Sequence, residues 1–236
     1  MIIYVNGDSH SAGHGTQNPA GMCYNDVRYH ELGSAPHPDN LPHSYGYQLA
    51  GDLELDLVCQ AESGSSVERS IRLTKQFLYQ TNQNVFVLIG FPSIEREEWQ
   101  YENTWYQINA SGHNALPAGL QTQYKEWIAK YDNDVWHRRA LYLNDVIYHF
   151  HNWLASRNIA HLFFNTEQSL SANTIHHDFD AGYLGAYDNT LIYSHWLRAQ
   201  GHVPDAWSHF GADAHRAWAD FLKPFINDNI RKRRQS

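Results

Sequence analysis

The strongest constraint on the fold is the run of five consecutive apolar residues from Val85 to Ile89. Neighbouring side chains of a strand point to opposite faces of its sheet, so a strand made only of apolar residues has to be covered on both faces. Similar runs at residues 2–5, 55–59 and 161–164 predict three further strands. The chain is therefore expected to build a buried sheet between two layers of helices.

Segments with helical periodicity lie between these strands. The clearest has Leu143, Ile147, Phe150 and Leu154 in steps of four, three and four, which places them on one face of a helix. The expected helices cover residues 44–53, 67–80, 118–131, 134–157 and 213–230. The alternation predicts an α/β fold: a three-layer, flavodoxin-like architecture with a central parallel sheet of four to five strands and helices on both faces.

No internal repeat or linker-like tract divides the chain, which predicts a single domain over residues 1–236. Two segments, residues 10–46 and 166–203, have the character of long loops. Long loops in a compact domain are often functional, and ligands of parallel sheets bind beyond the carboxyl ends of the strands. The functional residues are therefore expected where the strands end.

The formal net charge of −8 argues against nucleic-acid binding, because the only basic cluster is residues 231–234 at the end of the chain. The sequence starts without a signal peptide and has no apolar stretch of about 20 residues, so we expect no membrane insertion and a soluble protein that stays where it is made, for example in the cytoplasm. Cys23 and Cys59 do not predict a disulfide framework. Residues 109–111 fit a glycosylation acceptor that is idle without secretion.

Ser9 is the candidate nucleophile. It lies in Gly7-Asp8-Ser9, directly after the first predicted strand, which places its hydroxyl at the carboxyl edge of the sheet. A serine hydroxyl attacks a carbonyl only when a base removes its proton. The alternative for a serine in such a segment is to cap the turn with its side chain. Which of the two applies depends on whether a base and oxyanion donors follow in the chain.

Gly7-Asp8-Ser9 resembles the first sequence block of the SGNH (GDSL-type) serine hydrolases, which lies on the first strand near the N-terminus. Residues 61–69 follow the second predicted strand and resemble the second block of this family. In that block the backbone N–H of a glycine helps to hold the oxyanion, and Gly64 lies at its position. Backbone donors need no reorganisation as charge develops on the oxygen. The alternative for Gly64 is a simple turn before a helix.

The third block of the family contains a Gly-x-Asn-Asp motif whose asparagine also binds the oxyanion. Here the strand continues into Gly90-Phe91-Pro92-Ser93, so the asparagine is missing. Divergent members, including virus-encoded ones, carry Ser or Thr in this loop, which implies Ser93 as the replacement donor. A hydroxyl donates one hydrogen bond, so we expect weak activity or an oxyanion site rebuilt from other groups. The alternative is that Ser93 caps a helix with Arg96 and Glu97 in its first turn.

Asp205 and His209 are the candidate acid and base. Residues 204–211 resemble the last block of the family, in which an Asp and a His precede the C-terminal helix, and His215 and Trp218 match the pattern on that helix. A neutral imidazole accepts the serine proton, and a carboxylate fixes its tautomer. Asp205 lies four residues before His209 instead of the usual three, so a turn absorbs one residue or another group is the acid. His215 is an alternative base, but its helical position favours packing or capping.

The resemblance implies a serine esterase that needs no cofactor and acts on a small-molecule or glycan ester. Its substrates in the family range from lipids and thioesters to acetylated sugars. The aromatic content of 14% favours acyl groups on carbohydrate, because aromatic rings form stacking surfaces for sugars. Aromatic side chains also fill cores and cleft walls. The resemblance does not extend over residues 95–200, which are expected to hold substrate-specific elements. The sequence leaves the oligomeric state open.

Two other functions compete with this interpretation. A metal-dependent hydrolase takes its ligands from histidines and carboxylates, but no His-Glu-x-x-His helix or other regular ligand spacing is present, so no metal is expected. The candidates for such a set are His10, His14, His37, His43, His176, His177 and Asp178. A non-catalytic SGNH-like module that binds a glycan or a protein, for example in a virion, is favoured by the missing asparagine and the Asp–His spacing.

Overall fold

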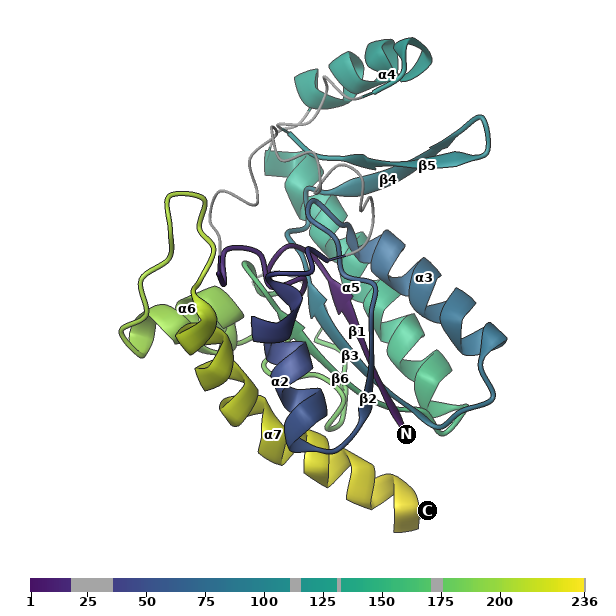
Figure 1. The fold of residues 1–236 in the computed structure, drawn as a ribbon. Coiled ribbons are helices and arrows are strands. Elements are labelled where there is room, and N and C mark those ends of the chain that lie inside the picture. Colours follow the sequence, from purple (N-terminus) through teal and green to yellow (C-terminus); the bar gives the residue numbers. More distant parts are fainter. Residues whose placement is uncertain (18–35, 111–115, 131–132, 171–175, 236) are drawn as a thin grey trace.

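A central sheet of four parallel strands organises the chain (Figure 1). The computed structural model describes residues 1–17, 36–110, 116–130, 133–170 and 176–235. The strands lie in the order β2-β1-β3-β6 and are β1 (Ile2–Gly7), β2 (Asp56–Cys59), β3 (Val85–Phe91) and β6 (Ala160–Asn165). All four expected strands are present, and the three-layer α/β architecture is confirmed.

Each face of the sheet is covered by its own group of helices (Figure 1). One layer consists of α2 (Tyr45–Asp52), α6 (Tyr193–Ala199) and α7 (Ala212–Gln235), and the other of α3 (Val67–Gln80) and α5 (Asn133–Ala155). The side chains of β1 alternate between the two cores: Ile3 and Val5 join the first, Ile2 and Tyr4 the second. This double coverage is why the strands carry apolar residues at successive positions.

A hairpin extends the fold beyond the carboxyl edge of the sheet (Figure 1). It is formed by β4 (Glu97–Tyr101) and β5 (Thr104–Ile108), and α4 (Ala118–Ala129) packs against it through a small core that includes Ile108 and Leu120. The two residues between the strands, Glu102 and Asn103, both have positive φ, as a tight hairpin turn of this length requires. The hairpin was not predicted from the sequence, but it lies in the segment expected to hold substrate-specific elements.

Two local predictions were wrong. Residues 166–203 are not wholly a loop, because they contain α6 and a short 3-10 helix, Asn189–Leu191. Ser93 does not cap a helix, because the chain makes a turn there, with Arg96 N donating to Ser93 O at 3.4 Å, and then enters β4. Cys23 and Ser111 lie outside the described residues, as do the side chains of residues 232–234, and Cys59 is a free thiol.

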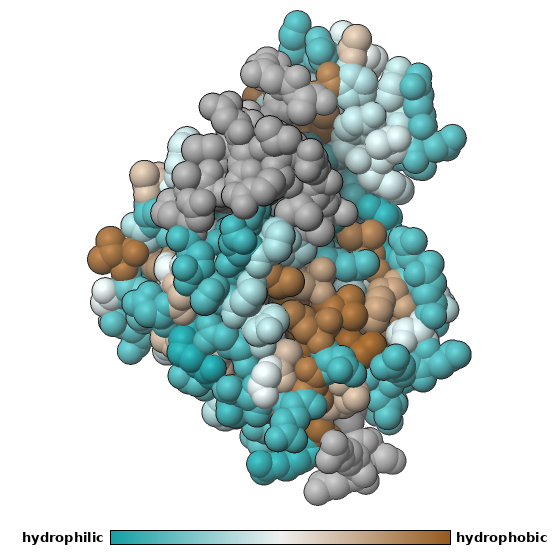
Figure 2. Space-filling view, viewed as in Figure 1, coloured by the Kyte–Doolittle hydropathy of each residue, from teal (hydrophilic) through white to brown (hydrophobic). Residues whose placement is uncertain are grey.

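The surface is mostly hydrophilic on the face that Figure 2 draws, with hydrophobic residues gathered in the middle of it, in the region of β1 and β2. Since β2 is an edge strand, its residues from Leu57 to Cys59 stay partly exposed. No helix in the described part of the chain is long and apolar enough to cross a membrane.

Trp218 on α7 is fully buried against Phe164 of β6 and Tyr193 of α6. We expect Trp218→Ala to lower the free energy of unfolding by about 3–5 kcal/mol, because it removes a large buried side chain and leaves a cavity. Phe225→Ala, on the same helix but 38% exposed, is the control and should cost less than about 1 kcal/mol. Urea denaturation measures both, and equal losses would contradict the packing described.

Candidate active site

Ser9 lies where β1 ends, in a succession of tight turns. His14 N donates to Ser9 O at 3.0 Å and Ala12 N to Asp8 O at 2.9 Å, which fixes the backbone on both sides of the serine. The Ser9 side chain is 6% exposed, and among the described residues its hydroxyl makes no hydrogen bond. The structure thus places the expected nucleophile at the carboxyl edge of the sheet, with its hydroxyl available to a ligand.

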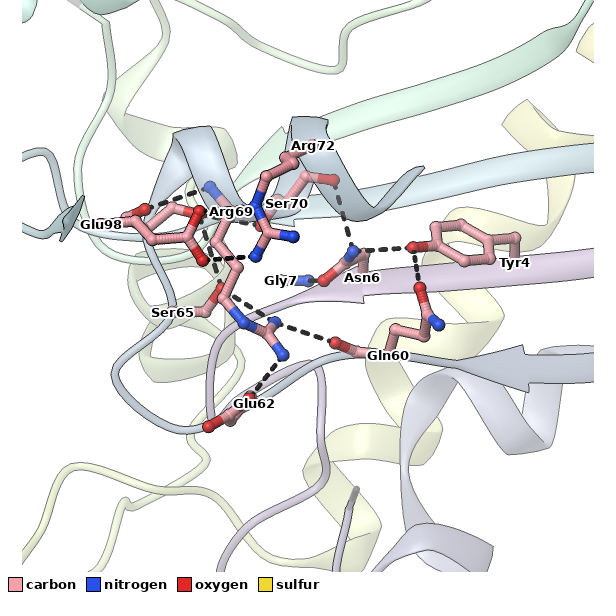
Figure 3. Close-up of polar contacts among 11 residues, drawn as sticks. Tyr4, Asn6, Gly7, Gln60, Glu62, Ser65, Arg69, Ser70, Arg72 and Glu98 are labelled. Atoms are coloured by element: carbon pink, nitrogen blue, oxygen red, sulfur yellow. Dashed lines mark hydrogen bonds and ion pairs between the residues drawn. The ribbon is translucent and has the colours of Figure 1, made fainter. Parts of the chain in front are cut away.

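The end of β1 is held by a buried polar network (Figure 3). Asn6 donates through Nδ2 to the Tyr4 hydroxyl at 2.8 Å and to Ser70 O of α3 at 3.3 Å. Its Oδ1 accepts from Gly7 N at 2.8 Å. Because the amide nitrogen and oxygen of Asn6 are both hydrogen-bonded inside the protein, the strand end that precedes Ser9 has one defined position.

The Asp8 carboxylate joins the ends of three strands. It is fully buried, and Oδ2 accepts from Arg96 Nη1 and from the Thr166 hydroxyl, each at 3.1 Å. Arg96 follows β3 and Thr166 follows β6, while Asp8 itself follows β1. A buried carboxylate is tolerated only with such charge and hydrogen-bond compensation. These partners were not identified from the sequence, although each is a polar residue shortly after a predicted strand.

Asp205 and His209 share one turn before α7. Asp205 Oδ1 accepts from the backbone N–H groups of Trp207 and His209, both at 2.8 Å, and Asp205 N donates to His209 O at 2.7 Å. Ser208, within this turn, takes a positive φ of 66°. The two side chains face each other, with His209 Nδ1 and Asp205 Oδ1 at 3.9 Å.

This acid and base are close but do not form a hydrogen bond. His209 Nδ1 and Asp205 Oδ2 are both buried and have no hydrogen-bond partner among the described residues. Asp205 Oδ1 is already used by backbone donors, so Oδ2 is the acceptor left for the imidazole. Catalytic hydrogen bonds are often long in unliganded enzymes and tighten when substrate binds.

The turn that contains Ser9 packs against His209. The rings of His10 and His14 lie 5.3 Å and 6.0 Å from the His209 ring, centroid to centroid. Gly15 has a φ of +79°, and a Cβ there would lie 2.7 Å from His209 Cβ, so glycine is what allows this approach. Burial, followed by the nearby charge of His10, lowers the pKa of His209 to about 4, while Asp205 acts in the opposite direction. His209 is therefore neutral near pH 7 and able to accept a proton.

His10 forms a second pair with Glu167. His10 Nε2 lies 3.3 Å from Glu167 Oε1, and this contact, with Arg96 close by, holds the pKa of the Glu167 carboxyl well below its usual range. Asp8, His10 and Glu167 are the three described residues whose ligand atoms lie close enough to hold a metal ion. Arg96 contacts both carboxylates, at 3.1 Å and 3.8 Å, so its guanidinium already supplies the positive charge that a cation would bring. The other histidines considered as metal ligands are not part of this group.

Gly64 lies in the loop between β2 and α3 with a φ of +75°. Two side chains of the hairpin segment lie beside it: Asn109 Nδ2 and Gln107 Oε1 are 3.4 Å and 3.6 Å from the position of a Cβ at Gly64. Polar side chains of another segment therefore lie beside Gly64, and the loop is more than a simple turn before a helix.

Ser93 is 1% exposed and its hydroxyl donates to the Glu95 carboxylate. Its single proton is committed to that bond in this arrangement. His215, the alternative base, is fully buried: its Nδ1 accepts from Tyr45 N at 3.2 Å, and its Nε2 lies 3.2 Å from the Tyr193 hydroxyl. These contacts fit the packing and capping role predicted for it.

No protein-family model matches the chain, and no curated protein matches it either. Among solved structures, the chain is similar to a carbohydrate esterase whose active site is described as having divergent catalytic and non-catalytic binding functions, at 14% identity and a TM-score of 0.47. That alignment covers 96% of this chain and 64% of the other, so the chain spans slightly less than two thirds of the esterase structure.

Two further structures are similar. One is the psychrotrophic esterase EstA from Pseudoalteromonas sp., inhibited by monoethylphosphonate, at 11% identity, with 100% and 99% of the two chains covered and a TM-score of 0.42. The other is a carbohydrate esterase family 2 enzyme with a carbohydrate-binding domain from Corynascus thermopiles (Myceliophthora fergusii), at 14% identity, with 97% and 66% covered and a TM-score of 0.44. All three are described as esterases.

The buried histidines predict a loss of stability in acid. Burial lowers the pKa of His14 and His215 to about 3 and that of His209 to about 4, whereas the unfolded chain has the ordinary value of 6.5. Above pH 6.5 these groups are neutral in both states. Between pH 6.5 and about 4 the unfolded chain binds more protons, so the free energy of unfolding falls by up to about 1.4 kcal/mol per pH unit for each histidine.

Thermal unfolding followed by circular dichroism from pH 7.5 to 4.5 measures this effect, and we expect the Tm to decrease by about 10 °C or more. His215→Asn should make the dependence on pH shallower. The matched control is His195→Gln, at an exposed histidine, which should leave the slope as it is. A Tm independent of pH in this range would contradict the prediction.

Proposed function

We propose that the chain is a serine-dependent hydrolase that cleaves carboxylic esters through an acyl-enzyme. The observation that carries the proposal is the arrangement at the carboxyl edge of the sheet: the turn of Ser9 packs on a buried, neutral His209, whose Nδ1 faces the carboxylate of Asp205. A nucleophile, a base and an acid that orients the base are the groups that acyl transfer requires.

In the first half of the reaction, Ser9 Oγ attacks the carbonyl carbon of the ester and His209 takes the serine proton. The bond between the carbonyl carbon and the alcohol oxygen then breaks, and His209 returns the proton to the departing alcohol. In the second half, a water molecule gives a proton to His209 and attacks the acyl carbon. The bond between the acyl carbon and Ser9 Oγ then breaks, and His209 returns the proton to Ser9 as the carboxylic acid leaves. No metal or organic cofactor takes part in these steps.

Asp205 stabilises the imidazolium that exists during both halves. Asp205 Oδ2 and His209 Nδ1 are both buried without a partner among the described residues, so an approach of these two atoms satisfies an acceptor and a donor at once. The pair therefore gains a hydrogen bond at the moment when His209 acquires its charge, and the stabilisation applies to the transition state more than to the resting enzyme.

The oxyanion is assigned to the backbone N–H groups of Ser9 and Gly64. Ser93 adds a third donor only when its hydroxyl turns away from Glu95. The side-chain amide of Asn109 lies beside Gly64, at the edge of this proposed oxyanion site. The substrate we propose is a small acyl group on an alcohol, with carbohydrate as the favoured alcohol.

A non-catalytic binding module is the second candidate function, and the bond between Ser93 and Glu95 favours it because it removes an oxyanion donor. A fluorophosphonate probe separates the two functions. Labelling of the wild type that is absent in Ser9→Ala supports an activated serine, whereas an unlabelled wild type supports the binding module.

Ser9→Ala is expected to lower the hydrolysis of p-nitrophenyl acetate by about 1,000-fold or more, because it removes the nucleophile. The release of p-nitrophenolate measures the rate, with and without a chelator. We expect the wild type to resist the chelator. Equal rates for both proteins would contradict the serine mechanism, and a rate that the chelator abolishes would favour a metal-dependent hydrolase.

The dependence of kcat/KM on pH is expected to follow the pKa of His209. The neutral imidazole is the active form, so activity rises as pH increases through that pKa and is constant above it. With a pKa of about 4, kcat/KM should stay constant from pH 8 down to about pH 5 and fall below it. Circular dichroism at each pH controls for unfolding. A midpoint at pH 6.5 or above, with the protein still folded, would contradict this assignment.

A further inference from the structure

A polar pocket of about 490 Å³ lies beside the proposed oxyanion site, between the end of β2, helix α3 and the hairpin. The side chains that line it and matter here are Glu62, Arg69, Arg72, Glu98, Trp105 and Gln107. Its size is in the range of small-molecule sites. Figure 3 shows how Arg69 and Arg72 extend from α3 towards Glu62 and Glu98.

The charges in this pocket are paired. Arg72 donates from Nε and Nη2 to the two oxygens of Glu98, at 2.8 Å and 2.6 Å. Arg69, itself 4% exposed, donates to Glu62 and, at 3.1 Å, to Gln60 O. Each arginine is therefore neutralised by a carboxylate and held in a fixed plane, so the pocket offers directed hydrogen bonds without a net charge.

An aromatic surface completes the pocket. Trp105 on β5 is 42% exposed, and the Arg72 guanidinium lies 4.6 Å from its ring centroid, which fixes the orientation of the ring. An exposed indole in a polar pocket presents an apolar face together with a donor N–H. Sugars combine C–H faces with hydroxyl groups, and they match a site of this composition.

Gln107 connects the pocket to the proposed active site. It lines the pocket, and its Oε1 lies 3.6 Å from the Cβ position of Gly64. This oxygen is buried and has no hydrogen-bond partner among the described residues. A buried acceptor without a partner is costly, and a hydroxyl group of a ligand satisfies it.

We propose that this pocket binds a neutral pyranose ring of the substrate, with Trp105 against the ring and Gln107 and the paired arginines bonded to its hydroxyl groups. The inference rests on the proposed esterase function, since it places the sugar next to the oxyanion site at Gly64. It goes further by assigning the sugar to residues of α3 and of the hairpin, and by requiring a ligand without charge.

The test compares two substrates and two variants. Monoacetates of methyl β-D-glucopyranoside carry the sugar, and p-nitrophenyl acetate does not. We expect Trp105→Ala and Gln107→Ala to lower the ratio of kcat/KM for the sugar monoacetates to kcat/KM for p-nitrophenyl acetate by about tenfold or more. Tyr79→Ala, an exposed aromatic residue at the end of α3 and outside the pocket, is the matched control. Circular dichroism checks that each variant is folded.

Binding without catalysis separates this inference from the esterase function. Saturation-transfer NMR on Ser9→Ala protein with methyl β-D-glucopyranoside should show contact with the sugar, which Trp105→Ala in the same background abolishes. Binding that persists after Trp105→Ala, no binding at all, or a preference for the charged methyl β-D-glucuronoside would overturn the inference. Hydrolysis of p-nitrophenyl acetate that does not depend on Ser9 would instead overturn the proposed serine mechanism and leave the binding result to stand by itself.

Discussion

The buried carboxylate of Asp8 is the interaction on which the candidate site depends. A carboxylate with no exposed surface requires partners, and here they are Arg96 and Thr166, which follow β3 and β6. Arg96 is in turn held by α5, because Arg139 donates to Arg96 O at 2.7 Å. The Asp8 carboxylate thus fixes the loops after three parallel strands. The hairpin begins at Glu97, directly after Arg96, so the same contact also fixes where the hairpin starts. The position of Ser9 next to Asp8 is set by the same bonds.

Four buried histidines lie around this anchor. His10 is 2% exposed and is bound to Glu167, whereas His14, His209 and His215 are buried with lowered pKa values. Removing so many imidazoles from water costs stability in acid, and the same desolvation keeps His209 in its neutral form. The arrangement therefore lowers the stability in acid and keeps the His209 imidazole neutral near pH 7.

The parts of this fold that depend on local pattern were predictable. The apolar runs gave all four strands, and α3 spans Val67–Gln80 as its amphipathic periodicity predicts. The hairpin was missed because Glu97-Glu98-Trp99-Gln100-Tyr101 has no uniform alternation, and its aromatic side chains join a small core separate from those of the sheet. In the site, motif positions led to Ser9, Asp205 and His209. The roles of Arg96 and Glu167 were not predicted. They lie 88 and 157 residues from their partners, Asp8 and His10, and only the strand order brings them together.

The hairpin supplies a large part of the proposed sugar pocket. It follows β3, and the chain after it returns Gln107 and Asn109 to the side of Gly64. The same segment brings Trp105 and Glu98 to Arg72 of α3. Because both features belong to one segment, the proposed sugar pocket and the proposed oxyanion site meet at Gln107 and Gly64. This shared boundary is the physical reason to look for carbohydrate at Trp105 and Gln107.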